Sequence, residues 1–162
     1  MNRDGGRFLE AGHVLGIADE LDSRNALAAD LNGDGRMDLV YLTWEIWPAA
    51  RQRVRVLENQ IEDAGRWIAV ALPDNAMGIG ARVLVTGSNG AKAALTKVAG
   101  ESYGSQYFGP LHAGLGSETA IHSVEVRWPG GKNTVERKPH LNQVLKINAP
   151  DVQASSPPQL DR

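Results

Sequence analysis

Apolar and polar residues alternate at a period of two along much of this chain, and this limits the folds open to it. Residues 53–57 read RVRVL, and residues 82–86 and 123–127 repeat the pattern. Successive side chains of a β-strand point to opposite faces of a sheet, so the pattern predicts strands with one buried face. In the first of these strands, the predicted buried face carries Val54 and Val56.

Other segments complete an all-β pattern. Residues 38–43 and 67–72 are more continuously apolar and predict central strands, and residues 143–147 predict a last strand. Turn signals lie between these segments, and the one at residues 129–131 predicts a hairpin. Helical periodicity is weak, and the 18 glycines and 8 prolines fit a chain with many turns. We therefore expect an all-β fold.

The charge and composition of the chain limit the classes of partner and site that it can have. The 17 basic and 19 acidic residues give a net charge of −2, and no Lys/Arg cluster is present, so we expect no nucleic-acid partner. Cysteine is absent, which excludes disulfides and thiolate metal sites. No run has the length or apolarity of a signal peptide or a membrane span, so we expect no membrane insertion.

Residues 30–38, DLNGDGRMD, carry the strongest chemical signal in the sequence. Oxygen-bearing side chains recur at loop positions 1, 3, 5 and 9, and Gly35 at position 6 permits a sharp bend. A Ca²⁺ ion takes six to eight oxygen ligands, and alternate residues of a tight loop can turn inward to supply them. The predicted ligands are Asp30, Asn32, Asp34 and Asp38, with the backbone carbonyl of Arg36 at position 7.

The loop differs from an EF-hand. Position 12 is Tyr41 instead of a bidentate glutamate, and the residues after the loop predict a strand instead of a helix. The alternative is an ordinary Asp/Asn/Gly turn whose side chains cap backbone donors. Three carboxylates within nine residues repel one another without a cation, which favours calcium in a structural role, with a dissociation constant on the order of 10⁻⁴–10⁻³ M.

Two known families share these motifs. The loop region resembles the FG-GAP/VCBS-type repeat of integrin-like β-propellers, and the second half resembles the ASPIC/UnbV domain. That domain follows such repeats in cartilage acidic protein and many bacterial secreted proteins. The stretches similar to the repeat are residues 2–8, 29–40 and 54–59, and those similar to the domain are residues 78–83, 100–106, 111–116 and 123–131.

The resemblance implies a domain organisation and a location. It implies a single or partial repeat that contains the calcium loop, residues 1–62, followed by a small antiparallel β-sandwich, residues 63–148, and a shift in composition at residues 62–65 places the boundary. Residues 149–162 contain three prolines and few apolar residues, and this composition predicts a disordered tail. The resemblance also implies an extracellular or periplasmic location, no known catalytic residues, and the five metal ligands named above. One propeller blade does not bury its faces without neighbours. The chain is therefore expected to be the C-terminal part of a longer propeller-containing protein, or to associate through its blade edge.

Two other interpretations stay open beside a non-catalytic calcium-binding module with a protein or glycan partner. Trp44 and Trp47 flank a loop, and they indicate either a carbohydrate-binding surface or a cover between the two predicted domains. Residues 100–104 match the G-x-S-x-G pattern of a hydrolase that would use Ser102 with His112 or His140. That pattern requires a strand–turn–helix, and a glycine-rich loop is the alternative.

Overall fold

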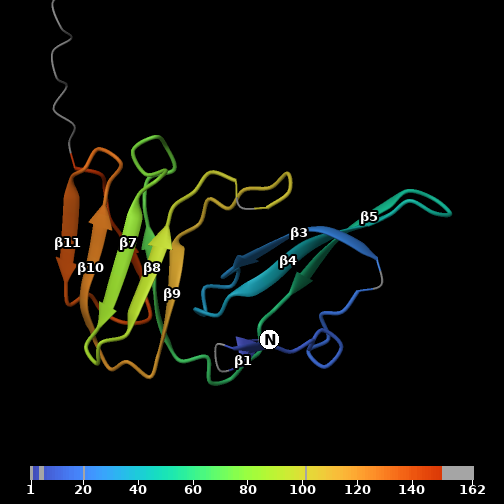
Figure 1. The fold of residues 1–162 in the computed structure, drawn as a ribbon, viewed down its shortest axis with the longest axis horizontal. Helices are drawn as coiled ribbons and strands as arrows, with labels where there is room; N and C mark the ends of the chain where they lie inside the picture. The colour runs from blue at the N-terminus through green and yellow to red at the C-terminus, as the bar shows by residue number, and fades with distance from the viewer. Residues whose placement is uncertain (1, 4–5, 20, 101, 151–162) are drawn as a thin grey trace, which may run out of the picture. The chain divides into compact units, whose positions relative to one another are not determined.

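The structure, a computed structural model, describes residues 2–3, 6–19, 21–100 and 102–150. These residues form twelve strands and no helix, which confirms the all-β prediction (Figure 1). They divide into two compact units. The first is Met1–Ala64 with Ala99–Tyr107, and the second is Gly65–Val98 with Phe108–Arg162. No described segment is a helix of the length and apolarity needed to cross a membrane.

The first unit contains a small hairpin and a three-stranded antiparallel sheet in the order β3-β4-β5. The predicted central strand at residues 38–43 is the middle strand of this sheet. The strands are β1 (Asn2–Arg3) and β2 (Arg7–Phe8) in the hairpin, and β3 (Asp22–Ala29), β4 (Asp38–Glu45) and β5 (Arg51–Leu57) in the sheet.

One face of the β3-β4-β5 sheet is apolar, with Val40 and Leu42 half-buried and the β5 valines exposed. Val54 lies opposite Leu42 and Val56 lies opposite Val40, so these four residues share a face. Val54 and Val56 are 67% and 57% exposed, and the prediction that they are buried is wrong. The alternation identified the strand correctly, but burial needs a second layer, and none of the described residues of this unit packs over these valines.

The second unit is a sandwich of two sheets. One sheet has the order β12-β6-β9, with β12 parallel to β6, and the other has the order β11-β10-β7-β8 and is antiparallel throughout. The first sheet consists of β6 (Arg66–Ala71), β9 (Leu111–Gly116) and β12 (Val144–Lys146). The second consists of β7 (Arg82–Gly87), β8 (Lys92–Thr96), β10 (Ile121–Arg127) and β11 (Asn133–Arg137).

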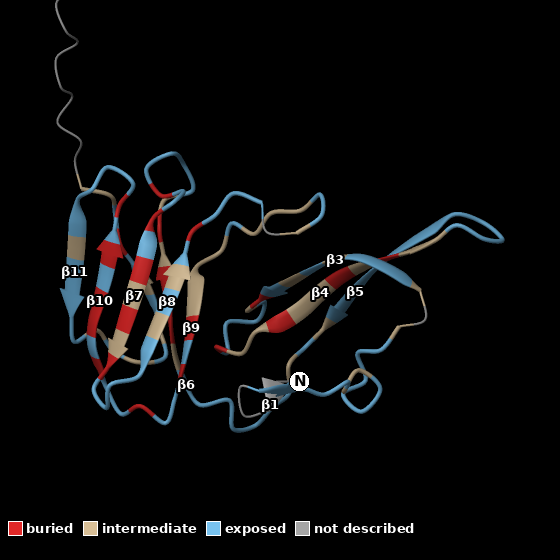
Figure 2. Ribbon diagram, viewed as in Figure 1, coloured by how far each residue is buried: buried red, intermediate tan, exposed pale blue. Residues whose placement is uncertain are grey.

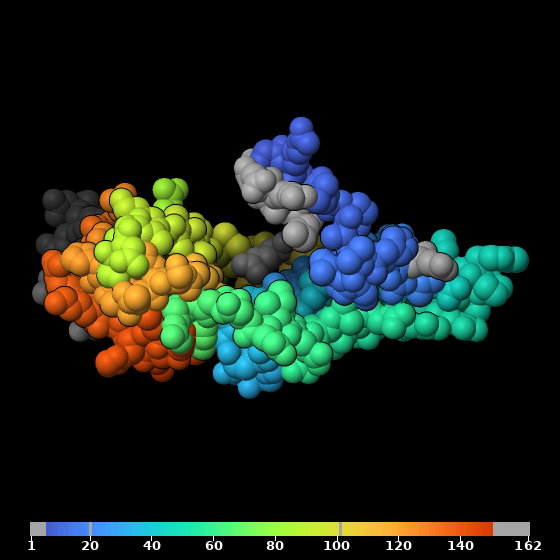
Figure 3. Space-filling view, turned by 90° about the horizontal axis from the view of Figure 1, so that it is seen from below, coloured from blue at the N-terminus to red at the C-terminus, as the bar shows by residue number. Residues whose placement is uncertain are grey.

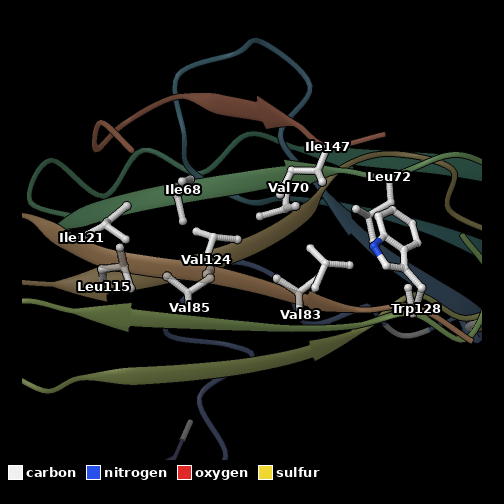
Figure 4. Packing of buried hydrophobic residues seen from close by; sticks show 13 residues of the cluster. Ile68, Val70, Leu72, Val83, Val85, Leu115, Ile121, Val124, Trp128 and Ile147 are labelled. Atoms are coloured by element: carbon white, nitrogen blue, oxygen red, sulfur yellow. The ribbon is translucent and has the colours of Figure 1, made fainter. Parts of the chain in front are cut away.

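The facing sides of these sheets form the core of the unit (Figures 2 and 4). Along β7 the even-numbered residues point outward, while Val83 and Val85 are at most 1% exposed. Trp128 lies at one end of the core and donates its indole N–H to Thr134 Oγ1 at 2.8 Å, so its polar atom is satisfied. The largest fully buried apolar side chains are Ile68, Ile121, Val70, Val83, Val85, Val124 and Val126.

The division into units resembles the expected domains but differs in one segment. Residues 99–107 were expected within the sandwich, whereas the structure groups them with the first unit. The backbone N–H of Ala26 in β3 donates to Ser102 Oγ at 3.2 Å, which explains the grouping. Of the expected tail at 149–162, Ala149 packs against the sandwich core, and residues 151–162 lie outside the described part of the chain.

A buried carboxylate holds the turn between β7 and β8. Glu118 is 4% exposed and accepts hydrogen bonds from the N–H groups of Asn89 at 2.9 Å and Ala91 at 3.1 Å, and from Ser88 Oγ at 3.1 Å. The Asn89 N–H is the main cause that lowers the pKa of Glu118. Gly87 is required beside it, because a Cβ there would lie 2.4 Å from Glu118 Cδ.

Substitutions of two valines test the difference in burial between the sandwich core and the exposed face of the first unit. Val85→Ala should lower the free energy of unfolding by about 2–3 kcal/mol, because it removes buried methyl groups and leaves a cavity. Val54→Ala, the matched change at a site 67% exposed, should change it by less than about 0.5 kcal/mol. Urea unfolding measures both, and equal losses in the two variants would contradict the burial described here.

Glu118 should make the sandwich sensitive to acid. Its folded-state pKa lies below the ordinary value of 4.5. Its contribution to stability is therefore complete above that ordinary value and is lost as the pH falls through the lowered folded-state pKa. Urea unfolding at neutral pH and near pH 3 should show a smaller acid-induced loss in Glu118→Gln than in the wild type. Glu136→Gln, an exposed change on β11, should behave like the wild type.

Candidate metal centre

The predicted calcium loop connects two adjacent antiparallel strands. Residues 30–37 run from the end of β3 to the start of β4, which begins at Asp38. The expected strand–loop–strand arrangement is confirmed, and no helix follows the loop. Gly33 and Gly35 have φ angles of 78° and 85°, in the left-handed region that glycine adopts without strain. The loop therefore turns sharply at its two glycines.

The Asp30 carboxylate stabilises the first half of the loop through hydrogen bonds to the backbone. One carboxylate oxygen accepts the N–H of Gly33 at 2.8 Å, and the other accepts the N–H of Gly35 at 2.9 Å. Asp30 thus satisfies backbone donors that a tight loop leaves unpaired. These contacts direct both carboxylate oxygens toward the interior of the turn.

Asn32, Asp34 and Arg36 form the exposed side of the loop. The Asn32 amide donates to Asp34 Oδ2 at 2.9 Å and to Glu58 Oε1 at 3.3 Å. Asp34 accepts the backbone N–H of Arg36 at 2.8 Å and forms an ion pair with its guanidinium. The Arg36 N–H is the main cause that lowers the pKa of Asp34, and the Asn32 amide and the guanidinium act in the same direction.

Glu58 was not predicted as a site residue, although the register places it there. Leu57, the last residue of β5, lies opposite Leu39, the second residue of β4. The next residue along the chain, Glu58, therefore reaches the loop that precedes β4. A carboxylate immediately after the third strand is the signal that sequence reasoning could have used.

Asp38 joins the loop to the end of β5. Its side chain is buried at 2% exposure and accepts the N–H of Leu31 at 3.0 Å and the N–H of Asn59 at 2.8 Å. The Asn59 amide in turn donates to the carbonyl of Met37 at 3.2 Å. The two backbone donors therefore give this buried carboxylate the hydrogen-bond partners that a buried polar group requires.

The structure places all five predicted ligands in one loop without gathering their carboxylates around one point. Among the described residues, no group of three His, Cys, Asp or Glu side chains is arranged to hold a metal ion. The donor chemistry nevertheless fits calcium, because the set consists of carboxylate, amide and carbonyl oxygens. Each carboxylate oxygen has two lone pairs, so an oxygen that accepts one N–H can still bind a cation.

The two tryptophans of the predicted contact surface lie in different environments. Trp47 is 82% exposed and Ile46 is 72% exposed, and both lie in the turn between β4 and β5. This hairpin is the teal segment of Figure 3. Trp44 is half-buried, and the guanidinium of Arg24 lies 5.5 Å from the centre of its ring. A free aromatic surface in this hairpin therefore consists of Trp47 and not of both indoles.

Ser102 lies in a turn. It forms an isolated β-bridge with Ser105, and its Oγ accepts the N–H of Ala26. No helix follows it in the described residues, so the strand–turn–helix of the hydrolase interpretation is not seen there. His112 is on β9 of the other unit, where its ring stacks on Trp67 with 5.5 Å between ring centres. His140 is exposed and lies between β11 and β12.

Comparison with known proteins identifies the second half of the chain. A family model described as ASPIC and UnbV matches residues 72–154, which is more than half of the 162 residues. No curated protein and no solved structure matches the chain. The matched residues include β7 to β12, and therefore most of the sandwich. The chain belongs to the ASPIC and UnbV family.

Proposed function

We propose that this chain is a non-catalytic, calcium-binding interaction module that works outside the cytoplasm. The observation that carries the proposal is a single loop between two strands that presents oxygen donors at alternate positions. Asp30, Asn32, Asp34, Asp38 and the Arg36 carbonyl would hold the ion.

The loop carries three carboxylates, and neither Asp30 nor Asp38 is in an ion pair with a described residue, which supports a cation there. The Asp34 carboxylate already faces a positive charge, the guanidinium of Arg36, and the Nε of that arginine is buried without a hydrogen-bond partner among the described residues. Burial of an unpaired polar atom lowers stability, so this arrangement is not an optimal one for Arg36. A calcium ion would neutralise the carboxylates and release the arginine side chain to solvent. Its role is structural, to hold the β3–β4 connection.

The exposed apolar face supports an FG-GAP/VCBS-type repeat in the first unit. The face carries Val40 and Leu42 of β4 and Val54 and Val56 of β5. Leu27 of β3 lies opposite Val40 and extends the face to the third strand. A propeller blade buries its faces only against neighbouring blades. We propose that this sheet is such a blade, and that a neighbouring blade covers the valines in the assembled protein.

The expected calcium affinity supports an extracellular or periplasmic location. A loop of three carboxylates, with one offset by Arg36, corresponds to a dissociation constant on the order of 10⁻⁴–10⁻³ M, as in extracellular modules. A site of that strength is filled where calcium is abundant. The same reasoning favours an extracellular or periplasmic environment for this module.

Calcium should raise the melting temperature of the protein relative to EGTA. At a calcium concentration about tenfold above the dissociation constant, the stabilisation should be about 1.4 kcal/mol. Asp34→Asn keeps the shape of the side chain but removes a charge, so it should weaken this response. Differential scanning calorimetry with EGTA and with millimolar calcium measures the effect.

A matched acidic change provides the control. Asp63 is exposed in the same unit and lies outside the loop, so Asp63→Asn should respond to calcium as the wild type does. A melting temperature that is the same in EGTA and in millimolar calcium would contradict the metal proposal. If calcium raised the melting temperatures of Asp34→Asn and Asp63→Asn equally, the ion would bind at a site outside this loop.

The exposure of Trp47 favours a second candidate, a carbohydrate-binding module that uses this indole. An exposed aromatic ring offers a flat apolar surface with a polar edge, which suits a sugar ring. On an array of neutral glycans the wild type should give signals that Trp47→Ala loses. Trp44→Ala should keep them, because Arg24 already covers part of that ring. An array without signal would eliminate this candidate.

A further inference from the structure

The outer face of the β11-β10-β7-β8 sheet carries an ordered set of polar side chains. The strand register aligns them in cross-strand rows. In the row nearest the end of β10, Arg127 lies opposite Arg82 on one side and Asn133 on the other, and Arg82 lies opposite Thr96. In the next row Glu125 lies between Leu84 and Val135. These residues point away from the core, because Val83 and Val126 beside them are buried.

Arg82 and Arg127 form a like-charged pair across β7 and β10. Residues directly opposite in an antiparallel pair have Cβ atoms about 4.5–5.5 Å apart, and like charges at such positions destabilise a sheet. Neither arginine forms an ion pair with a described residue, including Glu125, the one carboxylate of the two rows. A bound anion would be attracted to both guanidinium groups and would offset the repulsion between them.

The same residues line a hollow of about 440 Å³ on this face. That volume falls in the range of small-molecule sites, roughly 300–1,000 Å³. Its floor is aliphatic, with Leu84 and Ala94 from adjacent strands. Its rim is polar and consists of Arg82, Arg127, Glu125, Thr96 and Asn133.

We propose that this hollow binds an acidic carbohydrate, with the carboxylate of a uronic acid unit held between Arg82 and Arg127. Guanidinium groups bind carboxylates through paired, charge-assisted hydrogen bonds. A hydroxyl and an amide, from Thr96 and Asn133, flank the arginines in the same row and match the hydroxyls of a sugar. The aliphatic floor suits the C–H face of the ring. The ligand is therefore an anion that also carries many hydroxyls.

The hollow and the calcium loop belong to different units of the chain. All of the residues that line the hollow belong to the second unit, whereas the calcium loop belongs to the first. Binding is measured in EGTA, because uronic acids themselves bind calcium. A positive result in EGTA then supports the sugar site whatever the loop does, and a negative one leaves the calcium proposal intact.

The test is isothermal titration calorimetry of the full chain with a trimer of galacturonic acid at low ionic strength. The trimer should bind, and a neutral galactose trimer should not. Arg82→Gln and Arg127→Gln should each weaken binding about tenfold or more, since each removes a charged hydrogen-bond donor. Arg66→Gln is the matched control, because Arg66 is exposed on β6 of the other sheet.

Melting temperatures distinguish loss of binding from loss of folding. Arg82→Gln and Arg127→Gln should melt at the wild-type temperature or above it, because each relieves the repulsion between the two arginines. Absence of binding by the galacturonic acid trimer would overturn the proposal. Equal binding of the neutral trimer, inorganic sulfate binding as tightly as the uronic acid, or unchanged affinity in both variants would overturn it as well.

Discussion

The first unit depends on the buried carboxylate of Asp38. This side chain accepts the N–H of Leu31 at the start of the loop and the N–H of Asn59 just after β5. One charged group therefore joins the β3–β4 connection to the third strand of the sheet. Without these backbone donors a carboxylate that is 2% exposed would be strongly unfavourable, and without the carboxylate two backbone donors would lack a partner. The loop that carries the proposed calcium ligands takes its shape from this mutual dependence.

The two units bury their apolar residues in different ways. In the sandwich, two sheets face each other and the valines of β7 and β10 are almost fully buried. The sheet of the first unit covers only part of its surface, and Val54 and Val56 stay exposed. A carboxylate supports a connection in each unit, Asp38 in the first and Glu118 in the second. In the sandwich, Glu118 adds to the stability of a core that two sheets enclose. In the first unit, Asp38 stabilises a sheet that leaves part of its apolar face exposed.

Much of the fold could be predicted from the sequence, because period-two alternation and turn residues are local signals. The strands at 53–57, 82–86 and 123–127 and the hairpin at 129–131 all appear in the structure. The exposure of Val54 could not be predicted, since alternation defines an apolar face but not what covers it. The same limit applies to Ser102, whose bond to Ala26 joins segments 76 residues apart in the chain.

The candidate site was predicted in part. The spacing of residues 30–38 identified the loop and the strand that follows it, but Glu58 comes to the loop only through the register of β4 and β5. Which carboxylate oxygens bond to which backbone N–H groups also depends on the folded loop. The paired arginines of the sandwich face were not predicted as a site, because Arg82 and Arg127 are 45 positions apart and meet only across the sheet.

The most direct measurement of the central claim is a calcium titration followed through backbone amide chemical shifts. If the loop holds the ion, the amides of Leu31, Gly33, Gly35 and Asn59 should shift together and saturate with one dissociation constant, on the order of 10⁻⁴–10⁻³ M. The amides of the sandwich should stay in place. Loop amides that do not move up to about 10 mM calcium, well above that expected constant, would contradict the account.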